Sequence, residues 1–280
     1  MRYDDETLRK LQLTELHILK DIDRVCRKLN ITYFLDSGSV LGALRHGGFI
    51  PWDDDIDLGM PRADYDRFVR EAPALLGDAY VVSTPETNPH QAALFGKVWL
   101  AGTRFATNET IEAGFDQGIF VDILPYDALV ADPTRAAKQR KACRMWQSVS
   151  YLAHAKSIVV PHGGALGTAE KAACRAAHLV AAHAFRHDSI VARFTEAATL
   201  AQREGDPSDE LVVMAYANIA PYAVDMMLPP SKVVFEGCEF PAPARPEAYL
   251  EALYGDWETL PPVEKRRNHA PVELDFGPYA

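Results

Sequence analysis

The sequence predicts an α/β protein of the α+β type, in which helices pack against a sheet of short strands. Residues 4–29 place Leu and Ile at helical spacing, with charged residues between them. Apolar runs at 31–35, 79–83, 94–100 and 120–124 have the length of strands. Because the chain has 280 residues and 48% of them are hydrophobic, it is long enough to bury a substantial core.

Residues 1–130 are predicted to form an N-terminal helix and the core of the domain. The expected order is a helix at 4–29, a strand at 31–35, a Gly-Ser turn, a helix at 40–44, a strand through 55–58, a helix at 62–76, and strands at 79–83, 94–100 and 120–124. Pro125 has no N–H to donate, so we expect the last strand to stop before it.

Two further parts follow, a helical region at 131–225 and a C-terminal part at 226–280. From 133 to 169 the chain has basic residues but no acidic one, which predicts a basic amphipathic helix. After a Pro-His-Gly-Gly break, a second, Ala-rich helix is expected from 169 to 185, extending with interruption towards 203. The last part predicts a β-hairpin with its turn at Glu236-Gly237, a helix at 247–254 and a basic tail.

The composition argues against several classes of protein. A net charge of −10 does not favour a nucleic-acid binder, which needs an excess of Lys and Arg. The four cysteines form no C-x-x-C pair, so neither a disulfide framework nor a zinc site is indicated. The first ten residues carry no signal-peptide core and no apolar stretch is long enough to cross a bilayer. We therefore expect a cytoplasmic protein; the basic helix either covers the sheet or contacts the anionic inner face of the membrane.

An acidic cluster predicts a metal site. Four carboxylates within five residues, Asp53, Asp54, Asp55 and Asp57, repel one another unless cations offset their charge. In a strand, Asp55 and Asp57 would point to the same face, where they could hold Mg²⁺ or Mn²⁺. Asp122 stands alone in an apolar strand and is expected to be the third ligand. A solvated acidic turn and a buried Asp that caps a neighbouring backbone are the alternatives.

Phosphate contacts are predicted on both sides of this cluster. Gly38 and Ser39 precede a predicted helix, whose N-terminal amides suit a phosphate group. Lys97 and the tail residue Arg266 could offset phosphate charge. The alternatives are an ordinary turn with a Ser N-cap, an edge-strand lysine and a disordered basic tail.

The run from Asp36 to Met60, with its Pro-Trp-Asp-Asp-Asp-Ile-Asp and Gly-Met-Pro elements, closely resembles the LicD family, whose relatives include the fukutin proteins. The likeness continues in Phe95–Trp99, in Gly118–Pro125 and in the tail from Leu253 to His269, and it is weakest between 133 and 224. The resemblance implies a nucleotidyltransferase (DNA polymerase β-like) fold, with a mixed-sheet core, a helical insertion and a C-terminal extension. It also implies that a carboxylate from a later strand completes the Asp-x-Asp pair, which agrees with Asp122.

The resemblance implies metal-dependent transfer of a phosphorylated alcohol from a CDP-linked donor to a sugar of a cell-surface glycan such as lipopolysaccharide or teichoic acid, with an acceptor that could be lipid-linked. Phosphocholine is favoured, since Trp52 and other aromatic residues could attract its cationic head group. Asp53 or Asp54 could serve as the acceptor base, with His269 a weaker candidate. Ribitol-phosphate or glycerol-phosphate transfer, nucleotidyl transfer to a small molecule and an inert scaffold are the alternatives.

Overall fold

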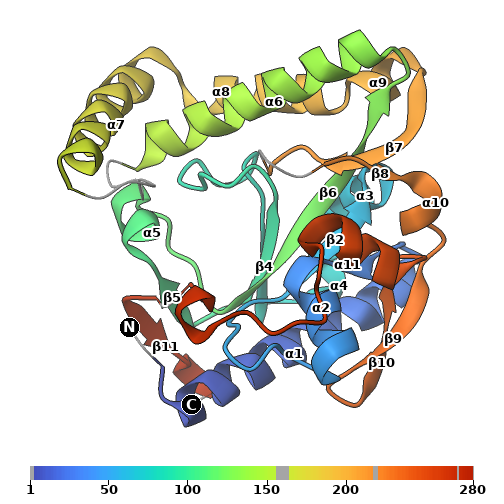
Figure 1. Ribbon diagram of the computed structural model, residues 1–280. Coiled ribbons are helices and arrows are strands. Elements are labelled where there is room, and N and C mark those ends of the chain that lie inside the picture. The colour runs from blue at the N-terminus through green and yellow to red at the C-terminus, as the bar shows by residue number, and fades with distance from the viewer. Residues whose placement is uncertain (1–2, 156–163, 217–219, 270, 280) are drawn as a thin grey trace.

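A computed structural model describes residues 3–155, 164–216, 220–269 and 271–279, and it has a mixed α/β architecture (Figure 1). The strands are β1 (Phe34–Leu35), β2 (Asp57–Pro61), β3 (Tyr80–Ser83), β4 (Gly96–Leu100), β5 (Arg104–Ala106), β6 (Phe120–Val130), β7 (Pro207–Val213), β8 (Tyr222–Ala223), β9 (Ser231–Phe235), β10 (Cys238–Ala242) and β11 (Glu273–Asp275). The helices are α1 (Asp5–Leu29), α2 (Ser37–His46), α3 (Arg62–Glu71), α4 (Pro73–Leu76), α5 (Asn108–Ala113), α6 (Pro133–His154), α7 (Gly164–Ala184), α8 (His187–Ala198), α9 (Leu200–Glu204), α10 (Val224–Met227) and α11 (Pro246–Tyr254). Two short 3₁₀ turns, Val263–Lys265 and Gly277–Tyr279, lie in the tail.

The main sheet has the order β1-β2-β6-β4-β3, and β7 and β8 extend it beside the second half of β6. The pair β2 and β6 is parallel, whereas β1 with β2, β4 with β6, and β7 with β6 are antiparallel. The sheet is therefore mixed, in agreement with the mixed-sheet core that the family resemblance implies. Because β7 lies within the predicted helical region 131–225, part of that region continues the sheet of the preceding part.

The prediction that Pro125 ends its strand is wrong, because β6 continues through it to Val130. The N–H of Asp122 donates to the carbonyl of Ile56 beside β2 at 2.9 Å, so position 125, three residues later, faces the opposite edge. On that edge, β6 pairs with β4 as far as Ile123, and its pairing with β7 begins at Tyr126. Pro125 falls between the two partner strands, where no ladder hydrogen bond is required of it.

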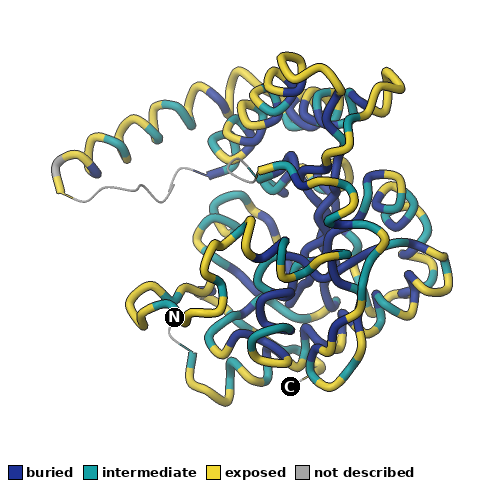
Figure 2. The backbone as a smooth tube through the Cα atoms, turned by 45° about the vertical axis from the view of Figure 1, so that its right-hand side comes forward, coloured by how far each residue is buried: buried dark blue, intermediate teal, exposed yellow. Residues whose placement is uncertain are grey.

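The helices cover the sheet as their apolar spacing requires. The predicted N-terminal helix is confirmed as α1, which buries Leu11, Ile18 and Ile22 under the sheet and is capped by Asp4. Helices α6, α7 and α8 form a separate layer at the top of Figure 1, and Figure 2 shows that α7 is exposed along most of its length. The break predicted at 161–164 lies mostly outside the described residues.

Local turn chemistry accounts for the C-terminal hairpin. Strands β9 and β10 pair in register around Glu236 and Gly237, which have φ values of 49° and 72°. Positive φ at both central residues matches a two-residue hairpin turn, so this prediction is confirmed. The predicted helix at 247–254 is also present, as α11. No helix in the described ranges combines the length and apolar character needed to span a membrane.

Candidate active site

Three of the side chains predicted to form the site lie in one row across the sheet. The ladder registers place Asp57 of β2 opposite Asp122 of β6, and Asp122 opposite Lys97 of β4. Directly opposed residues share a face of the sheet, so the three side chains are neighbours. Asp55 precedes β2 by two residues and adds a fourth polar group beside the row.

The carboxylates in and beside the row are buried or half-buried, and this burial raises the pKa of each. Burial, followed by the charges of Asp55 and Asp122, raises the pKa of Asp57 well above its ordinary value. Burial is also the largest cause of the raised pKa of Asp55 and of Asp122. The Oδ1 atom of Asp57 is buried and has no hydrogen-bond partner. Buried, mutually repelling carboxylates with an unsatisfied oxygen fit a site for a divalent cation, which favours oxygen ligands.

Lys97 lies at one end of the row, next to Asp122. Its Nζ atom is 2.5 Å from Oδ1 of Asp122 and 3.7 Å from the ring centroid of Phe120. A cation shared by Asp57 and Asp122 would therefore bind the second oxygen of Asp122 or replace the ammonium group.

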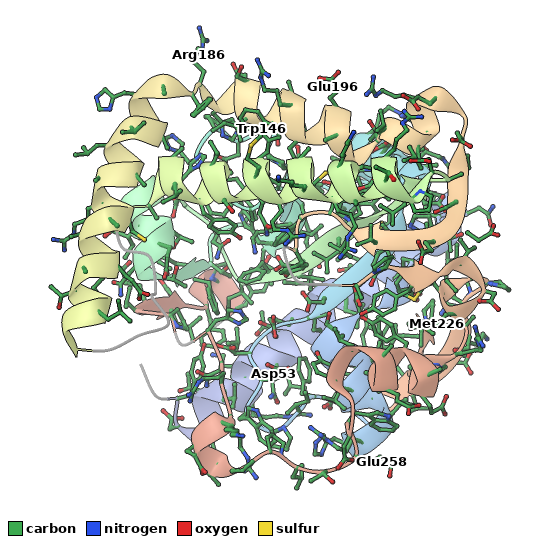
Figure 3. All side chains as sticks on the ribbon, turned by 45° about the horizontal axis from the view of Figure 1, so that its top comes forward. Asp53, Trp146, Arg186, Glu196, Met226 and Glu258 are labelled. Atoms are coloured by element: carbon green, nitrogen blue, oxygen red, sulfur yellow. The ribbon has the colours of Figure 1, made fainter. Side chains whose placement is uncertain are left out.

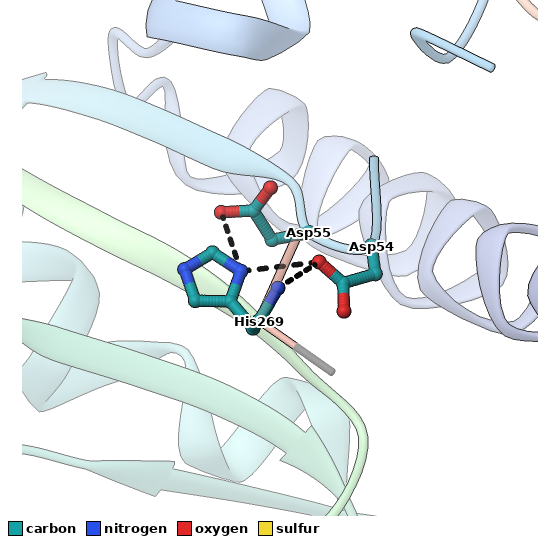
Figure 4. A group of neighbouring side chains, drawn as sticks. All are labelled: Asp54, Asp55 and His269. Carbon is teal, nitrogen blue, oxygen red and sulfur yellow. Dashed lines mark hydrogen bonds and ion pairs between the residues drawn. The ribbon is translucent and has the colours of Figure 1, made fainter. Parts of the chain in front are cut away.

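His269 and Asp54 form a second acid–base contact of the site. Asp54 is fully buried and accepts hydrogen bonds from the His269 backbone N–H at 2.8 Å, from Nδ1 at 3.2 Å and from the Tyr3 hydroxyl at 2.7 Å. The hydrogen bond with Asp54, with the charge of Asp55 adding to it, raises the pKa of His269 to about 9. Among the described residues, one ligand-type atom each of Asp54, Asp55 and His269 come within 4.8 Å of one another (Figure 4). Because a protonated Nδ1 donates rather than ligates, we interpret this trio as an ion pair that holds the tail onto the cluster.

The N-terminus of α2 faces the acids. Helix α2 starts at Ser37, three residues before the predicted start, because the Asp36 carboxylate caps it and accepts from the Ser37 N–H at 2.7 Å. Asp36 is buried and also accepts from the hydroxyls of Tyr126 and Tyr249. These bonds fix the direction of the helix towards the acidic row.

A cavity of about 540 Å³, which we call the α2 cavity, opens at this helix end. Asp53, Asp55, Asp57 and His269 line it together with Gly38. A Cβ atom on Gly38 would lie 2.9 Å from Oδ2 of Asp53, so the glycine lets the helix backbone approach the acids. Burial, followed by the charge of Asp55, raises the pKa of Asp53 to about 8. In Figure 3 Asp53 lies towards the centre of the molecule, whereas Glu258 lies at its edge.

Of the other residues predicted to bind the substrate, Trp52 lines this cavity, whereas Ser39 and Arg266 do not. The Ser39 hydroxyl accepts from the Asp57 N–H at 3.0 Å and so ties α2 to β2, while Ser37 lines the cavity. Trp52 lines the cavity, and the Arg266 guanidinium lies 4.3 Å from its ring centroid. Arg267, rather than Arg266, reaches the cavity wall.

Glu15 of α1 is a buried acid that interacts electrostatically with the acidic cluster and that the sequence analysis did not single out. It is fully buried and both carboxylate oxygens have no hydrogen-bond partner. Burial, with the charge of Asp55 next, raises its pKa well above the ordinary value. The signal in the sequence was an acid on the apolar face of the helix, four residues after Leu11 and four before Leu19.

Comparison with known proteins gives this site a family. Residues 30–128 match the model of the LicD/FKTN/FKRP nucleotidyltransferase domain. These residues therefore form a LicD-family domain, and they include the three residues of the row and Asp55 beside it.

Individual relatives match parts of the chain. The lipopolysaccharide cholinephosphotransferase LicD of Haemophilus influenzae is 37% identical over 128 residues, which are 45% of this chain and 47% of that protein. An uncharacterized protein of Rickettsia typhi is 41% identical over 64 residues, 23% of this chain and 21% of that protein. The human ribitol 5-phosphate transferase FKRP is 53% identical over 36 residues, 13% of this chain and 7% of its own length. The chain thus spans about half the length of the cholinephosphotransferase.

Proposed function

We propose that this protein is a divalent-metal-dependent transferase that moves a phosphorylated alcohol from a CDP-linked donor to a sugar hydroxyl of a cell-surface glycan. The observation that carries the proposal is the row of Asp57, Asp122 and Lys97 beside the N-terminus of α2, with a buried, unpartnered oxygen on Asp57. The family match and the transferase names of the relatives support it. We place the reaction in the cytoplasm, at the inner face of the membrane if the acceptor is lipid-linked.

The residues have distinct roles in the proposed reaction. Asp55, Asp57 and Asp122 would hold Mg²⁺ or Mn²⁺, which supplies the positive charge that the diphosphate needs. Amide groups at the start of α2 orient phosphate oxygens. Arg267 and Arg45, which also lines the α2 cavity, offset the remaining phosphate charge. Trp52 supplies an aromatic wall for the bound donor.

The chemical step is an in-line displacement at phosphorus. The acceptor oxygen bonds to the phosphorus of the alcohol phosphate as its proton passes to a carboxylate of the acidic cluster. The bond between that phosphorus and the bridging oxygen breaks, and CMP leaves with the electron pair. Asp53, which lines the α2 cavity, is our candidate for the proton acceptor, because a base must be within hydrogen-bond reach.

Phosphocholine is our first candidate for the transferred group. The relative with the longest match among those above is a cholinephosphotransferase. Ribitol phosphate is the second candidate, because the FKRP match, although only 36 residues long, reaches 53% identity.

A donor panel tests this proposal. The full chain is incubated with CDP-choline, CDP-ribitol and CDP-glycerol in Mg²⁺ or Mn²⁺, and products are followed by mass spectrometry. We expect slow CMP release from one donor even with water as acceptor, and none after chelation of the metal. An acceptor that carries the cytidine monophosphate group would instead indicate nucleotidyl transfer. If no donor is turned over, the proposal is contradicted.

A further inference from the structure

A second cavity, of about 620 Å³, lies on the other side of the acidic row, and we call it the α5 cavity. Its walls come from β4, β5, α5 and the end of α6, and its inner wall is formed by Asp122 and Lys97. Asn268 and His269 line both cavities. The reacting centre proposed above therefore lies between two cavities. The α2 cavity has the N-terminus of α2, Arg45 and Arg267 in its wall, whereas the described residues that line the α5 cavity include no arginine.

The α5 cavity is aromatic, but a cation already lies over two of its rings. Phe95, Phe115, Tyr151 and Tyr216 line it, and the rings of Phe95 and Tyr216 stack with centroids 5.6 Å apart. Nζ of Lys97 lies 5.4 Å from the centroid of Phe95, in addition to its contact with Phe120. A trimethylammonium group bound to the same faces would be repelled by this ammonium, and it would fill only a small part of the cavity.

Polar groups of the α5 cavity favour a ligand that donates hydrogen bonds. Gln117 is 4% exposed, and its Oε1 atom is buried with no hydrogen-bond partner. A buried acceptor without a donor is costly, and a ligand hydroxyl would satisfy it. Glu109 adds a second acceptor to the lining. A quaternary ammonium has no N–H to offer, whereas a sugar presents several hydroxyls and an apolar face that packs on aromatic rings.

The geometry of the reaction agrees with this chemistry. An in-line displacement brings the attacking oxygen to phosphorus from the side opposite the leaving oxygen. With the diphosphate at the start of α2, CMP occupies the α2 cavity, and the opposite side of the row is the α5 cavity. We infer that the α5 cavity binds the sugar acceptor, with Gln117 and Glu109 as specificity-determining residues. This inference rests on the proposed function for the direction of attack, but the binding of a sugar can be measured without any reaction.

The test measures binding of simple glycosides to the full chain by saturation-transfer NMR. The probes are methyl β-galactoside, methyl α-glucoside, methyl β-N-acetylglucosaminide and choline, each at the same millimolar concentration. We expect at least one glycoside to bind, and Gln117→Leu to weaken that binding about tenfold or more, which corresponds to the loss of one buried hydrogen bond. Gln202→Leu makes the same chemical change on an exposed position of α9 and is expected to leave binding unchanged. A thermal melt of each variant checks that it is folded.

The possible outcomes separate this inference from the proposed function. Absence of glycoside binding, or binding that Gln117→Leu leaves intact, would overturn the acceptor assignment. Choline binding that is lost in Gln117→Leu would overturn it as well, since the cavity would then belong to the donor head group. If glycosides bind as expected but no CDP-alcohol releases CMP, the proposed function fails and the sugar site stands.

Discussion

Replacing Asp57 by Asn should reduce transfer, or CMP release from the donor, by about 10³-fold or more while leaving the protein folded. Asn keeps the size of the side chain but removes the charge that a divalent cation requires, and a thousandfold loss corresponds to about 4 kcal/mol of transition-state stabilisation. Without added metal we expect the variant to unfold at the same temperature as the wild type or higher. Burial and the neighbouring acids raise the pKa of Asp57, so ionising it at neutral pH opposes folding.

Metal-induced stabilisation gives this prediction a second readout. A cation that binds only the folded protein stabilises it by about 2.7 kcal/mol at one hundred times its dissociation constant. We expect Mg²⁺ or Mn²⁺ to raise the unfolding temperature of the wild type and to have little effect on Asp57→Asn. Asp78→Asn removes a carboxylate from an exposed loop and serves as the matched control. Unchanged turnover in Asp57→Asn would remove the row from the proposed reaction.

Local signals in the sequence predicted those parts of the fold that local interactions determine. The apolar spacing of α1 and the Glu236-Gly237 turn each specify their element without help from the rest of the chain. The small sheet of β5 and β11 could not be predicted in this way. Its strands are only three residues long, and Arg104 and Glu273, which are in contact across it, are 169 residues apart in the sequence. The continuation of β6 through Pro125 depends on where its pairing with β4 ends and its pairing with β7 begins. Both partner strands are distant in the sequence from Pro125, so no local pattern predicts it.

The candidate site shows the same division. The acids at 53–57 are contiguous, so their repulsion is visible in the sequence, and Asp122 is visible as an acid in an apolar strand. The roles of Ser37 and Ser39 depended on the first residue of α2, which the buried Asp36 cap and two distant tyrosines determine. The contact of Asp54 with Tyr3 and His269 joins both ends of the described chain, and no spacing rule predicts it.

A buried ion pair at the far end of β6 has the largest expected effect on stability. Arg62, at the start of α3, binds Asp127 of β6 through Nε at 2.7 Å and Nη2 at 2.8 Å. The two residues are 7% and 1% exposed. Arg62→Met leaves a buried carboxylate without its partner, so we expect the free energy of unfolding to fall by about 3–5 kcal/mol. Urea denaturation measures this loss.

The double variant Arg62→Met with Asp127→Leu distinguishes the charge from the packing. Removing both charges together is expected to recover most of the lost stability, because two well-packed apolar side chains replace a pair whose desolvation is costly. The exposed pair of Arg245 and Asp225, 2.8 Å apart, is the control, and Arg245→Met should change stability by less than about 1 kcal/mol. If the double variant were as unstable as Arg62→Met, the bidentate geometry itself, rather than relief of an unpaired charge, would hold α3 on the sheet.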